Sequence, residues 1–569
     1  MAHGYGKLVI RLKYYNVSID GAPPAKVAER TALFNLVEDI NGAAGAGDSI
    51  VAAYVDNKIA ELSDVVTADC NIRFVNVLSS EGRRIYERSI IILLVKAVKE
   101  LFPNRRVLIR HSVRYDIYFE IIGEKETLPE EIAAIEKYMR ELVSRRVPFT
   151  RVEVPEDEAE KLFQEKERQD LYNAMRERNR PYVLFYDFDG MLDCAYGFLA
   201  PHSGYLNDFS LLYRYPGAMM TMPRGSADKR RAERHAMYED VPKLLNVFAE
   251  YKDWGRILGI ENIGELNKAA RTGDAPDIVR VAEALQEKKI SQIADQITNT
   301  TERKKIVLIA GPSSSGKTTF ANRLSIHLRV NGFKTQIISM DNYFLDREDA
   351  PVDDGGGVNL ECPEALDIAL FSTQMRSLIA GQTVGIPVYN FHKSRRDERV
   401  QPLKVGNNEI LIVEGIHGLN PKVTASIPKE YKHRIYISAL TSLNIDDHNR
   451  IPTTDTRLIR RIVRDHAFRG TKAIETIGMW QSVRSGEEEY IFPYQESCDS
   501  MFNSGLIYEL GAMKSGAQTL LGEIEDNAPE YPEAVRLHRF LSYFAQIDTD
   551  DIPRNSILRE FIGGSCFRV

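Results

Sequence analysis

A glycine-rich stretch past the middle of the chain has the residue types and the spacing that hold phosphate. Residues 311–319 read GPSSSGKTT, which contains the pattern G-x-x-x-x-G-K-[ST]. The apolar run IVLIA precedes the stretch and the helical pattern FANRLSIHL follows it, which is the strand–loop–helix context that the pattern requires. Glycines let backbone amides turn toward phosphate, and the helix adds the positive end of its dipole. The stretch predicts a binding site for a nucleoside triphosphate.

The side chains of this loop have separate expected roles. Lys317 can reach the β- and γ-phosphates, and the Thr318 hydroxyl can ligate Mg²⁺. We therefore expect ATP and Mg²⁺ as cofactors. The residues expected to contact ATP are Gly311, Ser313, Ser314, Ser315, Gly316, Lys317, Thr318 and Thr319.

Two acids lie at or near the ends of predicted buried strands further along the chain. The strand KTQIISM runs into Asp341, and the strand NEILIVEGI leads to Glu414. Ligands of open α/β sheets gather at the carboxyl ends of parallel strands, so both acids should lie beside the phosphate loop. Asp341 can accept a proton from an attacking hydroxyl, although an ordinary surface acid is an equal alternative for this residue taken alone. Glu414 suits Mg²⁺ or a water bound to it.

A dense group of arginines follows in the helical pattern TRLIRRIVRDHAFRG. Such a group can be a solvated basic face, or it can be a lid that neutralises the charge of a phosphoryl group in transit. Beside a phosphate loop we favour the lid, because cations stabilise the transition state of phosphoryl transfer. The group consists of Arg457, Arg460, Arg461, Arg464 and Arg469.

From about Lys304 to Lys514 the chain resembles the uridine kinase and phosphoribulokinase family of P-loop kinases. The resemblance rests on the ordered motifs GPSSSGKT, SMDNYF, NLECPEALD, PVYNF, ILIVEGI and TRLIRRIVRDHAFRG. It implies that Asp341 is the base that activates a 5′-hydroxyl. It also implies that Glu361, where uridine kinases usually have Asp, holds the ribose hydroxyls, and that Tyr389 lies at the nucleoside.

The same resemblance assigns roles to three of the arginines and shows one departure. Arg461 and Arg464 correspond to the pair that faces ribose and phosphate, and Arg469 to the arginine just before the lid glycine. We therefore predict Asp341, Lys317, Arg464 and Arg469 as catalytic residues, with Arg461 at the substrate. Ser394 stands where uridine kinases carry a histidine that reads the pyrimidine edge, so selectivity for pyrimidines is not expected from this motif.

The residues before the phosphate loop predict further domains. Alternating and helical patterns predict a small β-grasp unit over residues 1–78, and a helix from Glu81 to about Pro103 opens an α+β sandwich over residues 79–240. Helical patterns predict a connector over residues 241–297, followed by a P-loop α/β kinase domain with a mostly parallel sheet over residues 298–569. The expected fold class is therefore multidomain, α/β and α+β.

The front part also resembles known domains. The segment from SIVAAYV to IYERS is similar to the TGS domain and its junction in threonyl-tRNA synthetases, and the following part is similar to the second N-terminal domain of those enzymes. That domain edits mischarged tRNA through an HxxxH and a CxxxH motif. We align these motifs with His111–Tyr115 (HSVRY) and Cys194–Phe198 (CAYGF), where Tyr115 and Phe198 replace two histidines. The resemblance thus implies a module without the hydrolytic or metal chemistry, in which His111 and Cys194 pack or line an altered pocket.

The whole arrangement resembles a group of bacterial uridine-kinase-like nucleoside kinases, which share segments like RSGEEEYIFP and SILREFIGGS near the end. Our main hypothesis is an ATP-dependent nucleoside kinase that phosphorylates the 5′-hydroxyl. The alternatives are a kinase of another sugar alcohol and a nucleotide-dependent regulator that binds RNA or tRNA.

Composition limits the partners and the location. The chain has 569 residues, of which 43% are hydrophobic and 27% charged, and its net charge of −7 argues against a surface built mainly for nucleic acid. For the basic stretch MPRGSADKRRAERHAMYED we favour a connector or a solvated helix face, with an RNA-contacting patch as the alternative. RNA binding therefore stays open, and so does self-association. The five cysteines form no CxxC pair, which predicts a cytoplasmic protein without disulfides or thiolate zinc sites. The sequence contains no long apolar run, which predicts that it has no membrane span.

Overall fold

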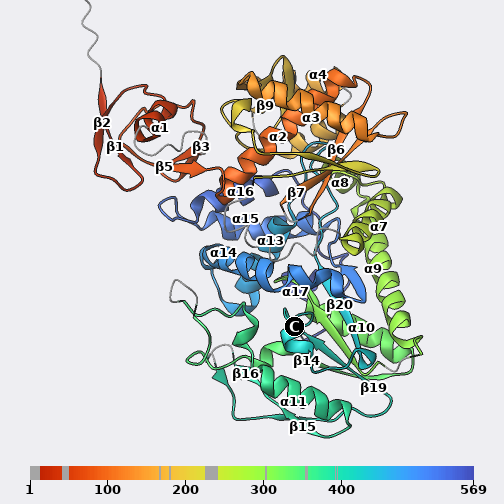
Figure 1. The fold of residues 1–569 in the computed structure, drawn as a ribbon. Coiled ribbons are helices and arrows are strands. Elements are labelled where there is room, and N and C mark those ends of the chain that lie inside the picture. Colours follow the sequence, from red (N-terminus) through yellow and green to blue (C-terminus); the bar gives the residue numbers. More distant parts are fainter. Residues whose placement is uncertain are drawn as a thin grey trace, which may run out of the picture.

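A computed structural model describes most of the chain, and its helices and strands follow the predicted order closely (Figure 1). The predictions on the basic stretch of residues 224–240 and on Ser394 lie outside the described residues. None of the described helices has the length and apolar character needed to cross a bilayer. The described residues are 13–41, 50–113, 115–165, 168–178, 181–223, 241–301, 304–352, 357–390, 393 and 395–568.

The first unit is a small mixed sheet that packs against one helix. Its strand order is β2-β1-β5-β3-β4, with β1 parallel to β5, and Val17, Leu36 and Ile72 lie in its core. This arrangement confirms the β-grasp expectation. The elements are β1 (Tyr14–Ile19), β2 (Ala25–Ala28), α1 (Leu33–Asn41), β3 (Ile50–Val55), β4 (Lys58–Ala60) and β5 (Cys70–Asn76).

The second unit contains two antiparallel sheets, of order β11-β12-β7-β6 and β10-β9-β8, with helices packed on them. The helix α2 begins after Ser79, whose side chain accepts a hydrogen bond from the Gly82 amide and so caps the first turn. An α+β unit is therefore confirmed. Its elements are α2 (Ser80–Leu101), β6 (Arg106–Val113), β7 (Asp116–Ile122), α3 (Pro129–Ser144), β8 (Phe149–Pro155), α4 (Glu156–Glu165), α5 (Gln169–Met175), β9 (Tyr182–Phe188), β10 (Met191–Cys194), β11 (Leu211–Arg214) and β12 (Gly217–Met220).

Three helices come next: α7 (Pro242–Leu258), α8 (Ile263–Thr272) and α9 (Ala275–Thr298). We expected a connector here, and the structure packs these helices into the cores of the following unit. Ile290 and Ile293 of α9 lie in the same buried cluster as Leu324 of the next helix, α10 (Lys317–Val330). The buried Arg323 of α10 also donates to Glu287 of α9 at 3.1 Å.

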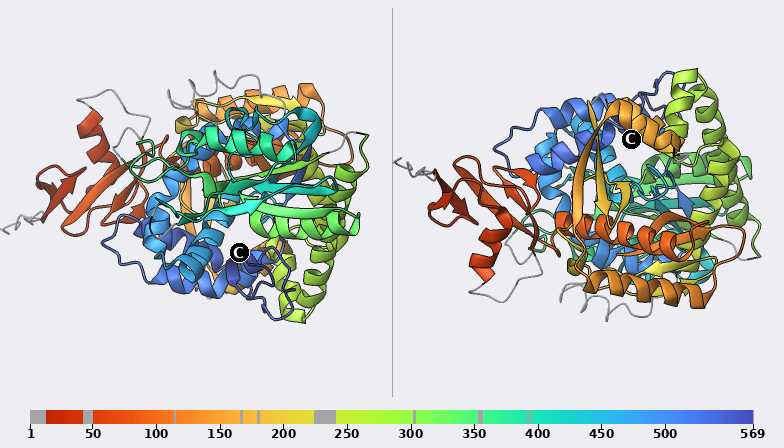
Figure 2. Two further views of the ribbon diagram at one scale, coloured as in Figure 1. Left: turned by 90° about the horizontal axis from the view of Figure 1, so that it is seen from below. Right: turned by 90° about the horizontal axis from the view of Figure 1, so that it is seen from above.

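A five-stranded, wholly parallel sheet forms the centre of the last unit, with strand order β14-β19-β13-β20-β21 (Figure 2). Both faces of β13 are covered. Val307 and Ile309 share a core with helices α9, α10 and α13 (Thr453–Arg469), and Ile306 and Leu308 share a core with α11 (Ile368–Ile379). This burial explains the continuous apolar run of β13. The strands are β13 (Ile306–Ala310), β14 (Lys334–Ser339), β19 (Glu409–Glu414), β20 (Lys432–Ser438) and β21 (Ser500–Asn503).

The remaining elements surround this sheet. The helices are α11 (Ile368–Ile379), α12 (Pro421–Thr424), α13 (Thr453–Arg469), α14 (Ala473–Tyr490), α15 (Glu509–Gly522), α16 (Tyr531–Leu541) and α17 (Arg559–Ile562), and the short strands are β15 (Val384–Ile386), β16 (Tyr389–Asn390), β17 (Arg395–Arg396) and β18 (Gln401–Leu403). The second and last units also touch directly, because Arg450 pairs with Glu87 of α2 through bonds of 2.9 and 3.2 Å.

Candidate functional site

The phosphate-type loop connects β13 to α10 at the carboxyl edge of the parallel sheet. A Cβ on Gly311 would lie 1.9 Å from the carbonyl oxygen of Ile437 in β20, so only glycine fits there. Gly316 precedes α10 with φ +82°, a left-handed conformation that glycine adopts without strain. The two motif glycines are therefore explained by close approach and by backbone conformation.

Lys317 lies folded over this loop. Its Nζ donates to the carbonyl oxygens of Gly311 and Pro312, both at 3.2 Å. Burial lowers the pKa of the Lys317 ammonium, and the negative charges of Glu414 and Asp341 oppose that shift. The lysine and the two predicted acids therefore belong to one electrostatic group, as the sequence predicted.

The two acids lie at the ends of adjacent strands. Glu414 ends β19 and is paired in register with Ser339, the last residue of β14, while Asp341 follows two residues later. Burial raises the pKa of Asp341, and burial together with the charge of Asp341 raises the pKa of Glu414 to about 7. Two crowded carboxylates of this kind gain from a nearby cation. Glu414, and Thr318 next to Lys317 in the sequence, therefore fit Mg²⁺ by the chemistry of their oxygens.

The predicted acceptor residues lie near this group. Glu361 packs against α14 at Gly486. A Cβ added to Gly486 would lie 2.4 Å from the Cβ of Glu361. Burial raises the pKa of Glu361 to about 7, and the positive charge of Arg461 opposes that shift. The charges of Lys317 and Asp341 also act on Glu361, so the structure brings this acid into the same site.

Tyr389 is buried and lies beside the segment that carries Asp341. Its backbone amide donates to the side-chain oxygen of Asn342 at 3.3 Å, and its ring meets Phe344 edge-on at 5.7 Å between centroids. The predicted nucleoside residue is thus joined to the predicted base through Asn342.

Three arginines of α13 share one carboxylate. Asp465 accepts from Arg461 at 3.2 Å and from Arg464 at 2.8 Å, and it lies 3.6 Å from Arg469. Arg461 also donates to the Ser313 hydroxyl in the loop at 2.9 Å. Arg469 is half exposed, whereas Arg461 and Arg464 are largely buried. Asp465 therefore holds these three cations near the loop.

The other two arginines of the group do not belong to a lid or to a solvated face. Arg457 and Arg460 are fully buried, where they pair with Glu487 and Glu509. Arg457 Nε donates to the Ser313 carbonyl at 3.0 Å. The lid expectation is wrong for these two residues, which brace the loop from inside the protein.

Two carboxylates that the motif analysis did not single out bind amides of the loop. The Ser313 amide donates to Glu487 of α14 at 3.0 Å, and the Thr319 amide donates to Glu560 of α17 at 3.0 Å. The segment around Glu560 also supplies Ile557, which lies against Gly316. The segments RSGEEEYIFP and SILREFIGGS, noted above only as a resemblance, contain these two acids.

The front-half motifs do not meet at one site. The His111 ring stacks on Phe248 at 4.0 Å and on Tyr118 at 5.0 Å, and burial lowers its pKa to about 3. Cys194 is buried in a different hydrophobic cluster, and the Phe198 carbonyl accepts from Arg88 of α2 at 3.1 Å. The His111 ring therefore packs against Phe248, and it also lines a cavity beside α7, so both expected roles, packing and pocket lining, apply to it.

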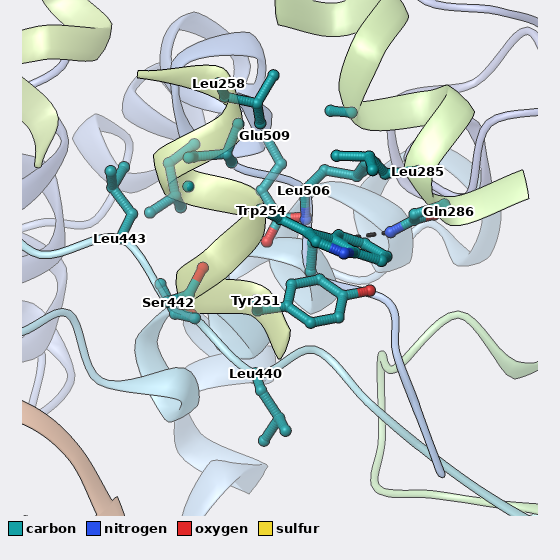
Figure 3. A pocket seen from close by; sticks show the side chains of 16 residues that line it. Tyr251, Trp254, Leu258, Leu285, Gln286, Leu440, Ser442, Leu443, Leu506 and Glu509 are labelled. Atoms are coloured by element: carbon teal, nitrogen blue, oxygen red, sulfur yellow. Dashed lines mark hydrogen bonds between the residues drawn. The ribbon is translucent and has the colours of Figure 1, made fainter. Parts of the chain in front are cut away.

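A small cavity of about 40 Å³ lies between α7, α9 and the segment after β21 (Figure 3). Tyr251, Trp254 and Leu506 line it, and its acid, Glu509, is the buried partner of Arg460. Ligand pockets usually measure about 300–1,000 Å³, so this cavity is too small to hold a nucleoside.

Comparison with known proteins classifies the region that carries the site. Residues 306–508 match the model of the Phosphoribulokinase / Uridine kinase family. This part of the chain therefore has the sequence pattern of that family. The match covers less than half of the chain and includes the phosphate loop, Asp341, Glu361 and the arginines of α13. A P-loop kinase domain is thereby confirmed.

The N-terminal region is similar to threonine–tRNA ligases. Those of Francisella tularensis subsp. novicida (strain U112) and subsp. holarctica (strain OSU18) are each 27% identical over 228 residues, which cover 38% of this chain and 35% of the relative. The chain thus spans about a third of the length of the curated relatives it matches.

One solved structure that is similar to this chain is a possible uridine kinase from Bacillus stearothermophilus. It has a TM-score of 0.23 and 22% sequence identity, and the similarity covers 26% of this chain and 79% of that chain. Another is D-glycerate 3-kinase from Cryptococcus neoformans var. grubii, with a TM-score of 0.24, 14% identity, and coverage of 38% and 87%. The classification rests on the family match alone.

Proposed function

We propose that the chain is an ATP-dependent kinase that transfers the γ-phosphate to the 5′-hydroxyl of a nucleoside. The observation that supports this most is the grouping of Asp341, Lys317 and Glu361 around one loop, with a raised pKa on both acids. One acid is thereby available for the hydroxyl and the other for the sugar. The family match supports the phosphotransfer chemistry.

The roles follow from charge and position. Asp341 orients the hydroxyl and accepts its proton, and its raised pKa makes it a better base near neutral pH than an exposed aspartate. Lys317 acts on the β- and γ-phosphates, while Arg464 and Arg469 act on the transferred group. Thr318 and Glu414 would hold Mg²⁺, which supplies charge neutralisation to the phosphates when bound.

The acceptor is proposed to be a nucleoside because of what lies opposite the loop. Glu361 offers carboxylate oxygens for two vicinal hydroxyls, and the buried Tyr389 offers an aromatic surface for a base. A second phosphate on the acceptor would instead need cations at the position of Glu361. These features favour a nucleoside over a phosphosugar.

A substrate panel tests the proposal. Purified protein with ATP and Mg²⁺ is given ribonucleosides, deoxyribonucleosides, sugar alcohols and phosphosugars, and ADP release is measured. We expect release that depends on a nucleoside and saturates with it. Release with sugar acceptors alone would contradict the nucleoside assignment, and saturable tRNA binding without turnover would support the regulator alternative instead.

A further inference from the structure

A second, larger cavity lies where the front half meets the kinase part. Its volume is about 300 Å³, which is within the range of small-molecule sites. Its walls come from α2, the end of β6, α7, β20, the start of α13, and α14 with the turn that follows. Aromatic side chains stand on several walls, namely Tyr86, Tyr115, Phe248, Tyr436 and Phe492.

The charges that line this cavity have a positive excess. Arg450 is paired with Glu87, and Arg484 donates to Glu488 at 3.1 Å. The charged lining residues are four arginines and two glutamates: Arg83, Arg450, Arg457, Arg484, Glu87 and Glu488. Glu487, which lies behind the lining and pairs with both Arg457 and Arg484, reduces the surplus of this group to one positive charge.

Arg83 and Tyr115 present a flat, polar surface in the cavity. The Arg83 guanidinium lies 4.7 Å from the centre of the Tyr115 ring, and the Tyr115 hydroxyl donates to Glu488 at 2.7 Å. A guanidinium over a phenol ring is a surface on which a planar heterocycle packs well.

The cavity is connected to the phosphate loop by hydrogen bonds. Arg457 lines the cavity and donates to the Ser313 carbonyl at 3.0 Å. Arg484, also in the lining, donates to Glu487 at 3.0 Å, and Glu487 accepts from the Ser313 amide at 3.0 Å. A ligand that draws on Arg484 therefore changes, through Glu487, how the loop is held.

We propose that this cavity binds a nucleoside monophosphate, with the base against the aromatic walls and the phosphate at the arginines, and that its occupancy acts on the phosphate loop. A phosphate monoester carries about −1.5 to −2 charge at neutral pH, which is opposite in sign to the surplus charge of the lining. Arginine forks bind phosphate oxygens in pairs. This site is separate from the acceptor site at Glu361 and takes no part in the proposed chemical step.

Calorimetric titration of the full chain with adenosine 5′-monophosphate and with uridine 5′-monophosphate tests this site. Because a monophosphate can also enter the acceptor site, the titrations use Glu361→Gln protein, in which acceptor binding is weakened. We expect at least one of the two nucleotides to bind to this protein. Adding Arg83→Gln should weaken that binding by about tenfold or more, because a hydrogen bond to a charged group is lost.

Arg145→Gln is the matched control, since Arg145 is an exposed residue at the end of α3 that pairs with Asp189 outside the cavity. It should leave the titration unchanged. Hydrogen exchange on Glu361→Gln protein with its cavity intact gives a second measurement, in which nucleotide should protect the start of α2 and the end of β6. Ser112→Phe, which puts a ring into the cavity, should remove both signals.

Several results would overturn the proposal. They are the absence of nucleotide binding to Glu361→Gln protein, binding that Arg83→Gln does not weaken, and inorganic phosphate binding as tightly as the nucleotides. Saturating nucleotide should also change the affinity of Glu361→Gln protein for ATP by about fivefold or more, the usual lower range of coupling between sites. An unchanged affinity would refute the link to the loop. These titrations decide the cavity site even if no nucleoside proves to be phosphorylated.

Discussion

Glu560 is expected to weaken ATP binding, because its carboxylate accepts a hydrogen bond from a backbone amide that would otherwise donate to phosphate. The Thr319 amide, in the first turn of α10, donates to Glu560 at 3.0 Å. Amides at such a helix start are the donors that bind the phosphates of a nucleotide. When ATP takes this amide, the carboxylate is displaced. At an assumed separation of about 7 Å it would repel each unit of phosphate charge by about 2 kcal/mol at an effective dielectric constant of about 20.

Removing that charge while keeping an acceptor should therefore strengthen ATP binding. Glu560→Gln retains an oxygen for the Thr319 amide, so its Kd for ATP, measured by calorimetry, should fall by about 10- to 30-fold with little change in unfolding temperature. Glu560→Ala removes the acceptor as well and should cost about 1 kcal/mol of stability. Glu525→Gln makes the same substitution at an exposed residue and should change neither quantity. An unchanged or weaker affinity of Glu560→Gln for ATP would refute the reasoning.

Three further outcomes follow from the buried charges. Lys317→Ala should abolish ADP release while the protein stays folded by circular dichroism, because the lysine acts on phosphate, and wild-type turnover would show that the site is misassigned. Burial raises the pKa of Glu414 to about 7, above its ordinary value, so the folded state holds a proton that the unfolded chain has lost and stability falls as pH rises toward 7. In urea unfolding, Glu414→Gln should therefore be more stable than wild type by about 1–3 kcal/mol at pH 8, but not at pH 4. Equal unfolding curves of the two proteins at pH 8 would contradict this. Arg460→Met should lower the free energy of unfolding by about 3–5 kcal/mol, because it leaves Glu509 buried and unpaired. The double variant Arg460→Met, Glu509→Gln should recover much of that loss. Wild-type stability of the single variant would contradict the pairing.

The sequence predicted the chemical centre well because its signals are local. The loop is specified by a short motif whose glycines have steric reasons visible in the structure, as at Gly311. Asp341 and Glu414 could be placed beside it because both lie at or just beyond the ends of parallel strands, and such ends meet at one edge of a sheet. The order of helices and strands followed from their periodicity in the same way.

The contacts that complete the site could not be predicted, because they join residues far apart in the chain. Glu487 binds the Ser313 amide across 174 positions, and Glu560 binds the Thr319 amide across 241. Spacing also does not reveal depth, so Arg457 looked like a lid residue although it is buried. His111 was aligned with the first position of an eroded HxxxH motif, and the sequence could not show that its ring packs against Phe248.

The kinetic comparison of Asp341→Asn with Glu361→Gln tests the proposed nucleoside kinase most directly. Asp341→Asn keeps the shape and loses the proton acceptor, so kcat should fall by about 10²–10⁴-fold with little change in KM for the nucleoside. Glu361→Gln should instead raise KM for the nucleoside, spare much of kcat, and leave KM for ATP nearly unchanged, because it removes binding that is present in both the ground and transition states. Full activity of Asp341→Asn, or damage to ATP binding rather than nucleoside binding in Glu361→Gln, would contradict the assignment of this site.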